Sequence, residues 1–415
     1  MMHKMPNEVS GGQLTAAKLI ELTEKYIMET YNPLPVVLVR GKGPWVWDIE
    51  GRKYLDMLSC YSALSHGHCH PRILKVLTQQ AKTLANISRA FYNDQMGLFC
   101  KELAEFAGFP KVLPMNTGAE AVEKAIKIVR KWGYTVKGIA RNRSKIIVCE
   151  NNFHGRTITI ISFSSEPLYK ENFGPHTPGF EIIPYGDLQA LKNAIDENTV
   201  GFLIEPIQGE GGVIIPPEGY LKGAKEICQK NNVLFMLDEI QTGLGRCGKR
   251  FAYEYEDAKP DVLTLGKALG AGPCIISAVL CGEKVDDVLM PGEDGSTFSG
   301  SPLSCAVARE GLKVLIEEGL VENSYELGNY FMAKLQEIET PFVKDIRGKG
   351  LFIALEIKPE HGDARFLCEK LWKEGLLCKE THFTNIRIAP PLIIKKGEID
   401  WAIKRIKKVL QAPQD

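Results

Sequence analysis

Short apolar runs alternate with segments of helical periodicity in the middle of the chain. Five runs of β-forming, mostly apolar residues occur at positions 111–115, 145–149, 200–205, 233–238 and 262–266. Between the first two runs, apolar side chains recur on one helical stripe, at Val122, Ala125, Ile126, Val129 and Trp132. Unbroken apolar runs separated by helices are typical of a parallel sheet that is covered on both faces. The pattern therefore predicts an α/β fold.

The two ends of the chain follow other patterns. Residues 14–30 predict a helix, and an extended, proline-containing arm follows it, with a hairpin turn at the sequence DIEG. Three strands are predicted near the C-terminus, at residues 346–358, 376–380 and 385–391. Apolar residues at helical spacing from Ile399 to Val409 predict a final helix.

These patterns divide the chain into three parts. We expect an N-terminal helix and arm at residues 1–60, a large domain at residues 61–320 and a smaller α+β domain at residues 321–415. A length of 415 residues, with 44% hydrophobic and 25% charged residues, is enough for more than one domain of ordinary globular composition.

Charge and targeting signals narrow the class of partner. Acidic and basic residues balance at 51 each, so the net charge offers no general attraction to nucleic acid or to an anionic membrane. The sequence has neither a secretory or transit signal at its start nor an apolar stretch near the roughly 20 residues that span a bilayer. We expect a cytoplasmic protein that acts on small molecules.

The 11 cysteines are scattered and form no C-x-x-C pair, which argues against a disulfide framework or a cysteine zinc site. A second possible metal motif is the cluster His66, His68, Cys69 and His70. Because Pro71 begins a helical pattern, the cluster is more typical of a turn into a helix than of a set of converging ligands. We expect no metal site.

The polar residues that follow the apolar runs are the first candidates for chemistry, because ligands bind at the carboxyl ends of parallel strands. After the run at 111–115, Thr117, Gly118 and Ala119 open the amphipathic helix. Free backbone N–H groups and the helix dipole favour a phosphate at such a helix start. The same residues are also an ordinary helix cap, so this feature alone decides nothing.

Two ionisable residues end neighbouring runs. Asp238 ends the run at 233–238, where it could form a salt bridge, bind Mg²⁺ or hold a pyridinium nitrogen. Lys267 follows the run at 262–266, where it could form an ion pair with Asp238 or serve as a desolvated, nucleophilic amine. A phosphate cradle, a carboxylate and an imine-forming lysine together are what pyridoxal 5′-phosphate requires from a protein. Phe153 could stack on its ring or belong to the core.

Six motifs occur in a fixed order: NTGAEA, FHGRT, EPIQGEGGV, DEIQTGLGR, LGKALG and GSTFSGSPL. Together they resemble the class III, or ω-amino acid, pyridoxal-phosphate aminotransferases of fold type I, over residues 31–391. The resemblance implies a large domain with a mainly parallel seven-stranded sheet, pyridoxal 5′-phosphate as the cofactor, and a homodimer with active sites at the subunit interface.

The resemblance also implies the roles of residues around the cofactor. Lys267 would form the imine with the cofactor and move the proton, and Asp238 would keep the pyridine nitrogen protonated. Phe153 would stack on the ring, and Gln241 would reach its phenolic oxygen. The phosphate would lie at the helix start described above, where Thr297 from the partner subunit would complete its site.

Within the class, the segments YNPLPVVLVRGKG, SCYSA, GHCHP and NIRIAPPL most resemble the members that use ornithine. This implies transfer of the δ-amino group of L-ornithine to 2-oxoglutarate, giving L-glutamate 5-semialdehyde and L-glutamate. Acetylornithine, 4-aminobutyrate or another ω-amino acid stays open as the donor. Residues 271–274, AGPC, and the serine-rich STFSGSPLS depart from the family pattern near the cofactor.

One pocket must then accept two substrates of different charge. In the family pattern, Glu210 would mask Arg387 while ornithine is bound and release it to bind the α-carboxylate of 2-oxoglutarate. Arg156 would hold the distal carboxylate of either substrate. Without the motif, Arg387 would be an outward-facing strand residue and Arg156 a loop residue.

Three further residues complete the predicted pocket. Tyr31 would contact the α-amino end of ornithine, and Tyr61 would line the pocket. Glu205 would support Arg387 or Gln241 from behind. From the residues alone, Tyr31 would be an exposed aromatic side chain of the arm.

Overall fold

The computed structural model describes residues 8–9 and 12–411. Its larger lobe is built on a seven-stranded sheet in the order β6-β12-β11-β10-β9-β7-β8. The strands are β6 (Lys111–Met115), β7 (Lys145–Cys149), β8 (Phe180–Ile183), β9 (Thr199–Ile204), β10 (Leu234–Asp238), β11 (Val262–Leu265) and β12 (Ser277–Cys281). Only β12 runs antiparallel to its neighbours. The predicted mainly parallel sheet of seven strands is confirmed.

All five predicted runs form strands of this sheet, with ends that agree to within one residue. Two strands were not predicted. In β8, Glu181 interrupts a run of only four residues, and in β12 the apolar run follows a glycine-containing loop. Such short runs have too little periodicity to predict a strand. They are strands in the structure because β8 pairs with β7 and β12 pairs with β6.

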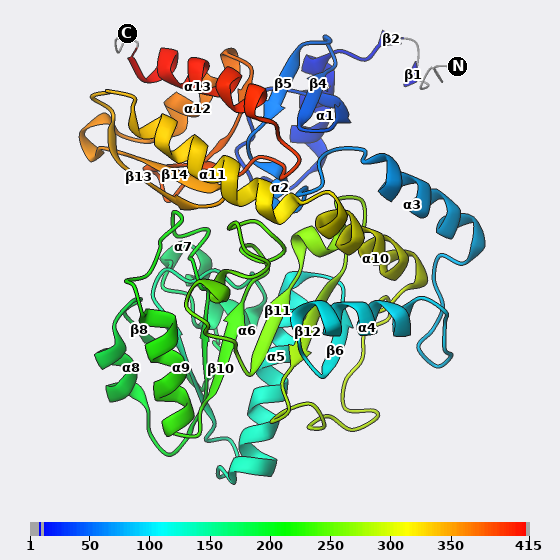
Figure 1. Cartoon of the computed structure of the whole chain (residues 1–415), viewed down its shortest axis with the longest axis vertical. Helices are drawn as coiled ribbons and strands as arrows, with labels where there is room; N and C mark the ends of the chain where they lie inside the picture. The colour runs from blue at the N-terminus through cyan, green and yellow to red at the C-terminus, as the bar shows by residue number, and fades with distance from the viewer. Residues whose placement is uncertain (1–7, 10–11, 412–415) are drawn as a thin grey trace.

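Helices cover both faces of the sheet (Figure 1). On one face lies α5 (Gly118–Trp132), and all five residues of its predicted stripe are buried. On the other lie α8 (Leu188–Ala194) and α9 (Tyr220–Lys230). Alternate residues of β10 enter the two cores, since Phe235 packs on the α9 side and Met236 on the α5 side. The remaining helices of this lobe are α3 (Pro71–Thr83), α4 (Met96–Ala107), α6 (Ile158–Ser162), α7 (Pro167–Lys170) and α10 (Pro302–Glu317).

The smaller lobe combines both ends of the chain (Figure 1). One antiparallel sheet has the order β13-β14-β17-β16, and a second sheet has the order β15-β5-β4-β3. The strands are β3 (Leu38–Lys42), β4 (Trp45–Asp48), β5 (Lys53–Asp56), β13 (Val343–Lys349), β14 (Phe352–Ile357), β15 (Leu376–Leu377), β16 (Lys379–Thr381) and β17 (Asn385–Ile388). Because β15 pairs with β5, the N-terminal arm is built into the C-terminal lobe.

Two of the predicted C-terminal strands each divide in the structure. The segment 346–358 is a hairpin, and Gly350, with a φ of 55°, makes the turn between β13 and β14. The segment 376–380 contributes β15 and β16 to different sheets. The periodicity of one run does not reveal a reversal of chain direction inside it.

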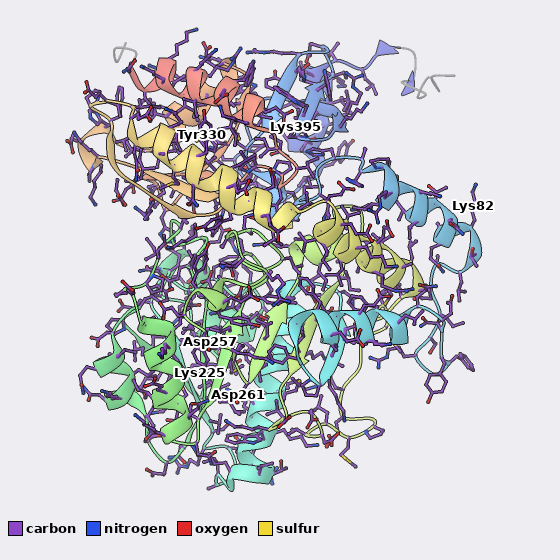
Figure 2. All side chains as sticks on the ribbon, in the orientation of Figure 1. Lys82, Lys225, Asp257, Asp261, Tyr330 and Lys395 are labelled. Carbon is purple, nitrogen blue, oxygen red and sulfur yellow. The ribbon has the colours of Figure 1, made fainter. Side chains whose placement is uncertain are left out.

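Helices complete the smaller lobe. They are α1 (Ala16–Tyr26), α11 (Leu320–Gln336), α12 (Arg365–Lys373) and α13 (Lys396–Gln411), which is the predicted final helix. Tyr330 of α11, labelled in Figure 2, donates a hydrogen bond of 2.5 Å to Asp400 of α13. The helix predicted at residues 14–30 is shorter, because the backbone is already extended at Ile27.

The domain limits at residues 60 and 320 stay predictions, and residues 1–7, 10–11 and 412–415 of the outer two parts lie outside the described residues. A short pair of strands, β1 (Glu8–Val9) and β2 (Gly12–Gln13), precedes α1. Across the described residues, no helix combines the length and apolar character that crossing a membrane requires.

A fully buried arginine joins the two lobes. Arg246, with 0% of its surface exposed, follows β10 in the larger lobe. Its guanidinium donates hydrogen bonds to the carbonyl oxygens of Leu351 (3.0 Å) and Pro390 (2.6 Å) in the smaller lobe and to Ser65 Oγ (3.2 Å). Arg246 thereby fixes the segments that carry the site residues relative to one another.

Candidate active site

A cavity of about 190 Å³ lies at the carboxyl ends of β10 and β11, the edge at which parallel sheets bind ligands. Seven of the predicted residues line it together: Gly118, Ala119, Phe153, Glu205, Asp238, Gln241 and Lys267. They come from five segments that are far apart in the sequence, and the sheet brings them together.

The start of α5 provides a site for an anion. Thr117 is the N-cap residue, and its hydroxyl accepts the N–H of Glu120 at 3.2 Å. The Glu120 carboxylate in turn accepts the backbone N–H groups of residues 116 and 117. The N–H groups of Gly118 and Ala119 have no acceptor among the described residues, as expected in the first turn of a helix. Thr117 is therefore a helix cap that leaves the next two N–H groups free for a phosphate.

Asp238 ends β10 and is buried. Its Oδ1 accepts the N–H of Ile240 at 3.0 Å, and its Oδ2 lies 2.7 Å from Nδ1 of His154. Burial by itself lowers the pKa of His154, but the hydrogen bond and negative charge of Asp238 outweigh it and raise the pKa. The imidazole of His154 and the N–H of Ile240 therefore hold the Asp238 carboxylate in place.

His154 was missed as a site residue. Its signal was its place in FHGRT, directly between the strand β7 and the predicted Arg156, with an ordinary core histidine as the alternative. Only the fold shows that its Nδ1 meets Asp238, which lies 84 positions away in the chain.

Glu239 points away from the cavity, although it follows Asp238 directly. Its carboxylate accepts the N–H groups of Ala252 (2.8 Å) and Tyr253 (2.9 Å) and the hydroxyl of Thr242 (3.0 Å). Burial raises the pKa of Glu239 to about 7. Of the two neighbouring acids, Asp238 serves the cavity and Glu239 holds a loop.

Lys267 follows β11 and has a left-handed backbone, with a φ of 44°. Its amine forms neither a hydrogen bond nor an ion pair with any residue that the structure describes. Burial lowers the pKa of Lys267, although the charge of Glu210 opposes the shift. The alternative of an ion pair with Asp238 is absent from the described residues, and Lys267 lines the shared cavity instead.

These observations fit pyridoxal 5′-phosphate. The two free N–H groups at the start of α5 match a phosphate, and Asp238 is a buried carboxylate suited to a protonated ring nitrogen. The unpaired amine of Lys267 lines the same cavity and suits an imine.

Beside the cavity, Glu210 and Arg387 form a closed pair. Arg387 of β17 is only 1% exposed, and its Nη1 lies 2.6 Å from Oε1 of Glu210. The same Nη1 donates to Oε1 of Gln241 at 3.1 Å, while Nε2 of Gln241 donates to Glu210 at 3.2 Å. Burial by itself raises the pKa of Glu210, but the positive charges of Arg387 and Lys267 outweigh it, so the net shift is downward. The alternative of an outward-facing Arg387 is wrong.

Tyr61 lies over Arg387, with the guanidinium carbon 5.0 Å from the centre of the tyrosine ring. It belongs to the turn α2 (Ser59–Ser62), whose four residues all have left-handed backbones, with φ of 49°, 48°, 57° and 73°. The turn contains no glycine, and left-handed geometry costs such residues roughly 1–2 kcal/mol each. Burial raises the pKa of Tyr61 to about 12.

The role predicted for Glu205 requires a correction. Its carboxylate accepts the N–H groups of Phe153 (2.9 Å) and Gly209 (3.1 Å) and bonds to neither Arg387 nor Gln241 among the described residues. Burial raises the pKa of Glu205 to about 7. Glu205 therefore holds the backbone of Phe153, which lines the cavity, and that of Gly209, next to Glu210.

Three of the predicted residues that do not line the small cavity are also exposed. Tyr31 is 73% exposed and lines a second cavity of about 540 Å³ together with Tyr61. Arg156 is exposed, and its guanidinium lies 4.1 Å from the ring centre of Tyr169. Thr297 is also exposed and lines a separate cavity of about 700 Å³.

The three histidines of the possible metal motif contact different partners. His66 Nε2 lies 2.9 Å from the carbonyl oxygen of Gly311, His68 pairs with Asp56, and His70 pairs with Glu318. The predicted helix start at residue 71 is confirmed by α3.

Comparison with known proteins identifies the class. The chain belongs to the class-III aminotransferases, whose family model matches residues 26–410. Pyridoxal phosphate is the cofactor of this class, so the predicted family, fold type and cofactor are confirmed.

Individual relatives are similar over almost their whole length. The ornithine aminotransferase of Brevibacillus brevis is 57% identical over 396 residues, which cover 95% of this chain and 98% of the relative. A structure of ornithine aminotransferase from Toxoplasma gondii, with pyridoxal phosphate partly occupying the active site, has a TM-score of 0.94 at 47% identity and covers 95% and 94% of the two chains. A structure of acetylornithine aminotransferase from Elizabethkingia anophelis has a TM-score of 0.87 at 46% identity and covers 95% and 98%.

Proposed function

We propose that this chain transfers the δ-amino group of L-ornithine to 2-oxoglutarate, giving L-glutamate 5-semialdehyde and L-glutamate. The observation that carries the proposal is the closed pair of Glu210 and Arg387 beside Lys267, with Tyr61 over the guanidinium. Such a pair suits an enzyme whose two substrates differ in charge at the same position. The relatives named ornithine aminotransferase, at 52–57% identity, support ornithine as the donor.

The residues of the small cavity would hold the cofactor. The N–H groups of Gly118 and Ala119 would bind its phosphate, Phe153 would lie on its ring, and Gln241 would reach its phenolic oxygen. When bound, pyridoxal phosphate supplies an electrophilic carbon and a ring that accepts the electron pair left by a departing proton.

Lys267 would do the proton transfer. Its lowered pKa favours the neutral amine, so Nζ can accept the proton that leaves the δ-carbon of ornithine and later return it. The carboxylate of Asp238, held by His154 and the N–H of Ile240, would face the ring nitrogen.

Glu210 and Arg387 would adapt the pocket to the two substrates. In the closed pair, Glu210 neutralises Arg387, so an ornithine side chain can enter without repulsion of its ammonium group. For 2-oxoglutarate, Arg387 would separate from Glu210 and bind the α-carboxylate through two hydrogen bonds. Arg156 would hold the distal carboxylate, and Tyr31 the α-amino end of ornithine.

A single-turnover experiment tests the donor. The cofactor-loaded enzyme is mixed separately with ornithine, acetylornithine and 4-aminobutyrate, and the change in cofactor absorbance is followed. We expect ornithine to react fastest, and Lys267→Ala to abolish the reaction while the chain stays folded. Equal or faster reaction with acetylornithine would refute ornithine as the preferred donor.

We further infer a cytoplasmic homodimer in which Thr297 completes the phosphate site of the partner. The exposure of Thr297, away from the cavity of its own chain, supports this. In sedimentation experiments the chain should have twice its monomer mass. A mixed dimer of one Lys267→Ala chain and one Thr297→Ala chain should then contain one site with both changes and one intact site. A chain that sediments as a monomer would contradict the inference.

A further inference from the structure

A buried carboxylate stands at the start of the strained turn that carries Tyr61. Asp56, the last residue of β5, is 8% exposed. Its Oδ1 accepts the N–H groups of Leu58 (2.9 Å) and Ser59 (2.8 Å), which lead into the turn. Its Oδ2 lies 2.8 Å from Nε2 of His68. Both oxygens of this carboxylate therefore have partners, one on the turn and one on the imidazole.

His68 is held in place by its backbone and by the strand beside its ring. Its N–H donates to the carbonyl oxygen of Gly43 at 2.8 Å, and its own carbonyl oxygen accepts the N–H of Gly43 at 2.9 Å. The imidazole lies against Gly41 of β3, where a Cβ atom would come within 2.7 Å of its Cβ and Cγ atoms. Strand β3 therefore has a glycine where the imidazole packs against it, because a larger residue there would displace the ring.

The turn needs such a hold, because its four residues are not glycine and a free chain would avoid their backbone conformation. Within the turn, backbone hydrogen bonds from Ser62 N to Leu58 O (3.2 Å) and from Leu64 N to Ser59 O (2.9 Å) stabilise the reversal of the chain. Neither of them fixes the direction in which the turn leaves β5. The backbone hydrogen bonds of Met57 with Leu377 and Ala389 hold the chain where it leaves β5. Those of Asp56 to Leu58 and Ser59 hold the start of the turn that carries the ring of Tyr61 over Arg387.

We propose that His68 and Asp56 form a positioning pair that holds the turn Ser59–Ser62 and thereby sets Tyr61 over Arg387, which makes the pair a determinant of amino-donor preference. The inference rests on the proposed function, since it takes Tyr61 as part of the substrate pocket. It also assigns a role to the motif GHCHP. His66 and His70 have other partners and do not contact Asp56.

Without the His68 donor, Oδ2 of Asp56 is a buried anionic oxygen with no partner among the described residues. Such an oxygen turns toward water or another donor, because a buried charge without a hydrogen bond is costly. The rotation removes Oδ1 from Leu58 and Ser59, and the turn relaxes toward ordinary backbone geometry. Tyr61 then leaves Arg387, while Lys267 and the phosphate site keep their places.

The test compares three variants of His68 in the full-length, cofactor-loaded enzyme. His68→Leu removes the donor, His68→Asn has an amide too short to reach Asp56, and His68→Gln restores a donor at similar reach. We expect the first two to lower kcat/KM for ornithine by about tenfold or more, and the third to recover most of it. The half-reaction with glutamate should change by less than about threefold, and cofactor affinity should stay the same. His70→Gln is the matched control and should behave as the parent enzyme.

A double-variant cycle then asks whether His68 acts through Tyr61. In a Tyr61→Ala background, His68→Leu should cause no further loss with ornithine, because the ring that the pair positions is gone. Independent, multiplicative losses would overturn the inference, as would equal losses with ornithine and glutamate. If His68→Leu fails to fold, His68→Asn and the cycle built on it decide in the same way. A parent enzyme that does not accept ornithine would refute the proposed function instead.

Discussion

The pair of Glu210 and Arg387 allows the most direct test of how the pocket accepts two substrates. The change is Glu210→Gln, which keeps the size of the side chain and an oxygen for Nη1 of Arg387 but removes the negative charge. Arg387 is almost fully buried, and the distance to Glu210 is 2.6 Å, so this hydrogen bond is strengthened by charge on both atoms.

The size of the effect of Glu210→Gln follows from the type of hydrogen bond that is weakened. A hydrogen bond between charged groups contributes about 1.5–3 kcal/mol, against about 0.5–1.5 kcal/mol for a neutral one. The variant should thus make opening of the pair easier by about 1–2 kcal/mol, which corresponds to about fivefold to thirtyfold in an equilibrium constant. If 2-oxoglutarate binds only to the open pair, as proposed, its apparent affinity should rise by that factor.

The assay measures both half-reactions separately in single turnover. For Glu210→Gln, kcat/KM with glutamate should rise, and kcat/KM with ornithine should fall, because an unmasked Arg387 repels the ornithine ammonium. Glu102→Gln, which breaks the pair with Arg309 away from the cavity, is the control and should change neither. If the ratio of the two half-reactions does not change, Glu210 does not mask Arg387 and the reasoning is wrong.

Three further predictions concern buried polar groups. His154→Gln removes the imidazole from Asp238 and should weaken cofactor binding about tenfold in an absorbance titration, and unchanged affinity would contradict the role of His154. Glu239 has a pKa raised from 4.5 to about 7, so it binds a proton more readily in the folded than in the unfolded chain, and its contribution to stability falls as the pH rises through that range. The free energy of unfolding of Glu239→Gln, measured in urea at several pH values across that range, should therefore depend less on pH than that of the parent. An unchanged pH dependence would show that Glu239 has an ordinary pKa. Arg246→Lys cannot reach both backbone carbonyls and the Ser65 hydroxyl, so the free energy of unfolding in urea should fall by about 2 kcal/mol, and a variant as stable as the parent would argue against Arg246 as the link between the lobes.

Local pattern was sufficient for the main elements of the larger lobe and for its chemistry. The five strands, the buried stripe of α5 and the cavity residues Asp238 and Lys267 all follow from runs of neighbouring residues. In a parallel sheet, the ends of the strands meet at one edge, so a polar residue just after an apolar run is already placed near a ligand. Family resemblance then added the residues whose positions no local pattern reveals, such as Arg387.

Only the tertiary structure decided the contacts between distant segments. The pairing of His154 with Asp238, the support that Glu205 gives to two stretches of backbone, and the contact between Asp56 and His68 depend on packing, not on periodicity. The left-handed turn around Tyr61 is the clearest case, because its residues have no intrinsic preference for that geometry. Sequence by itself determined five strands of the larger sheet, the helix α5 and the places of the reactive groups along the chain. The fold decided their partners, since a buried charge takes its pKa and its orientation from whatever the rest of the chain places beside it.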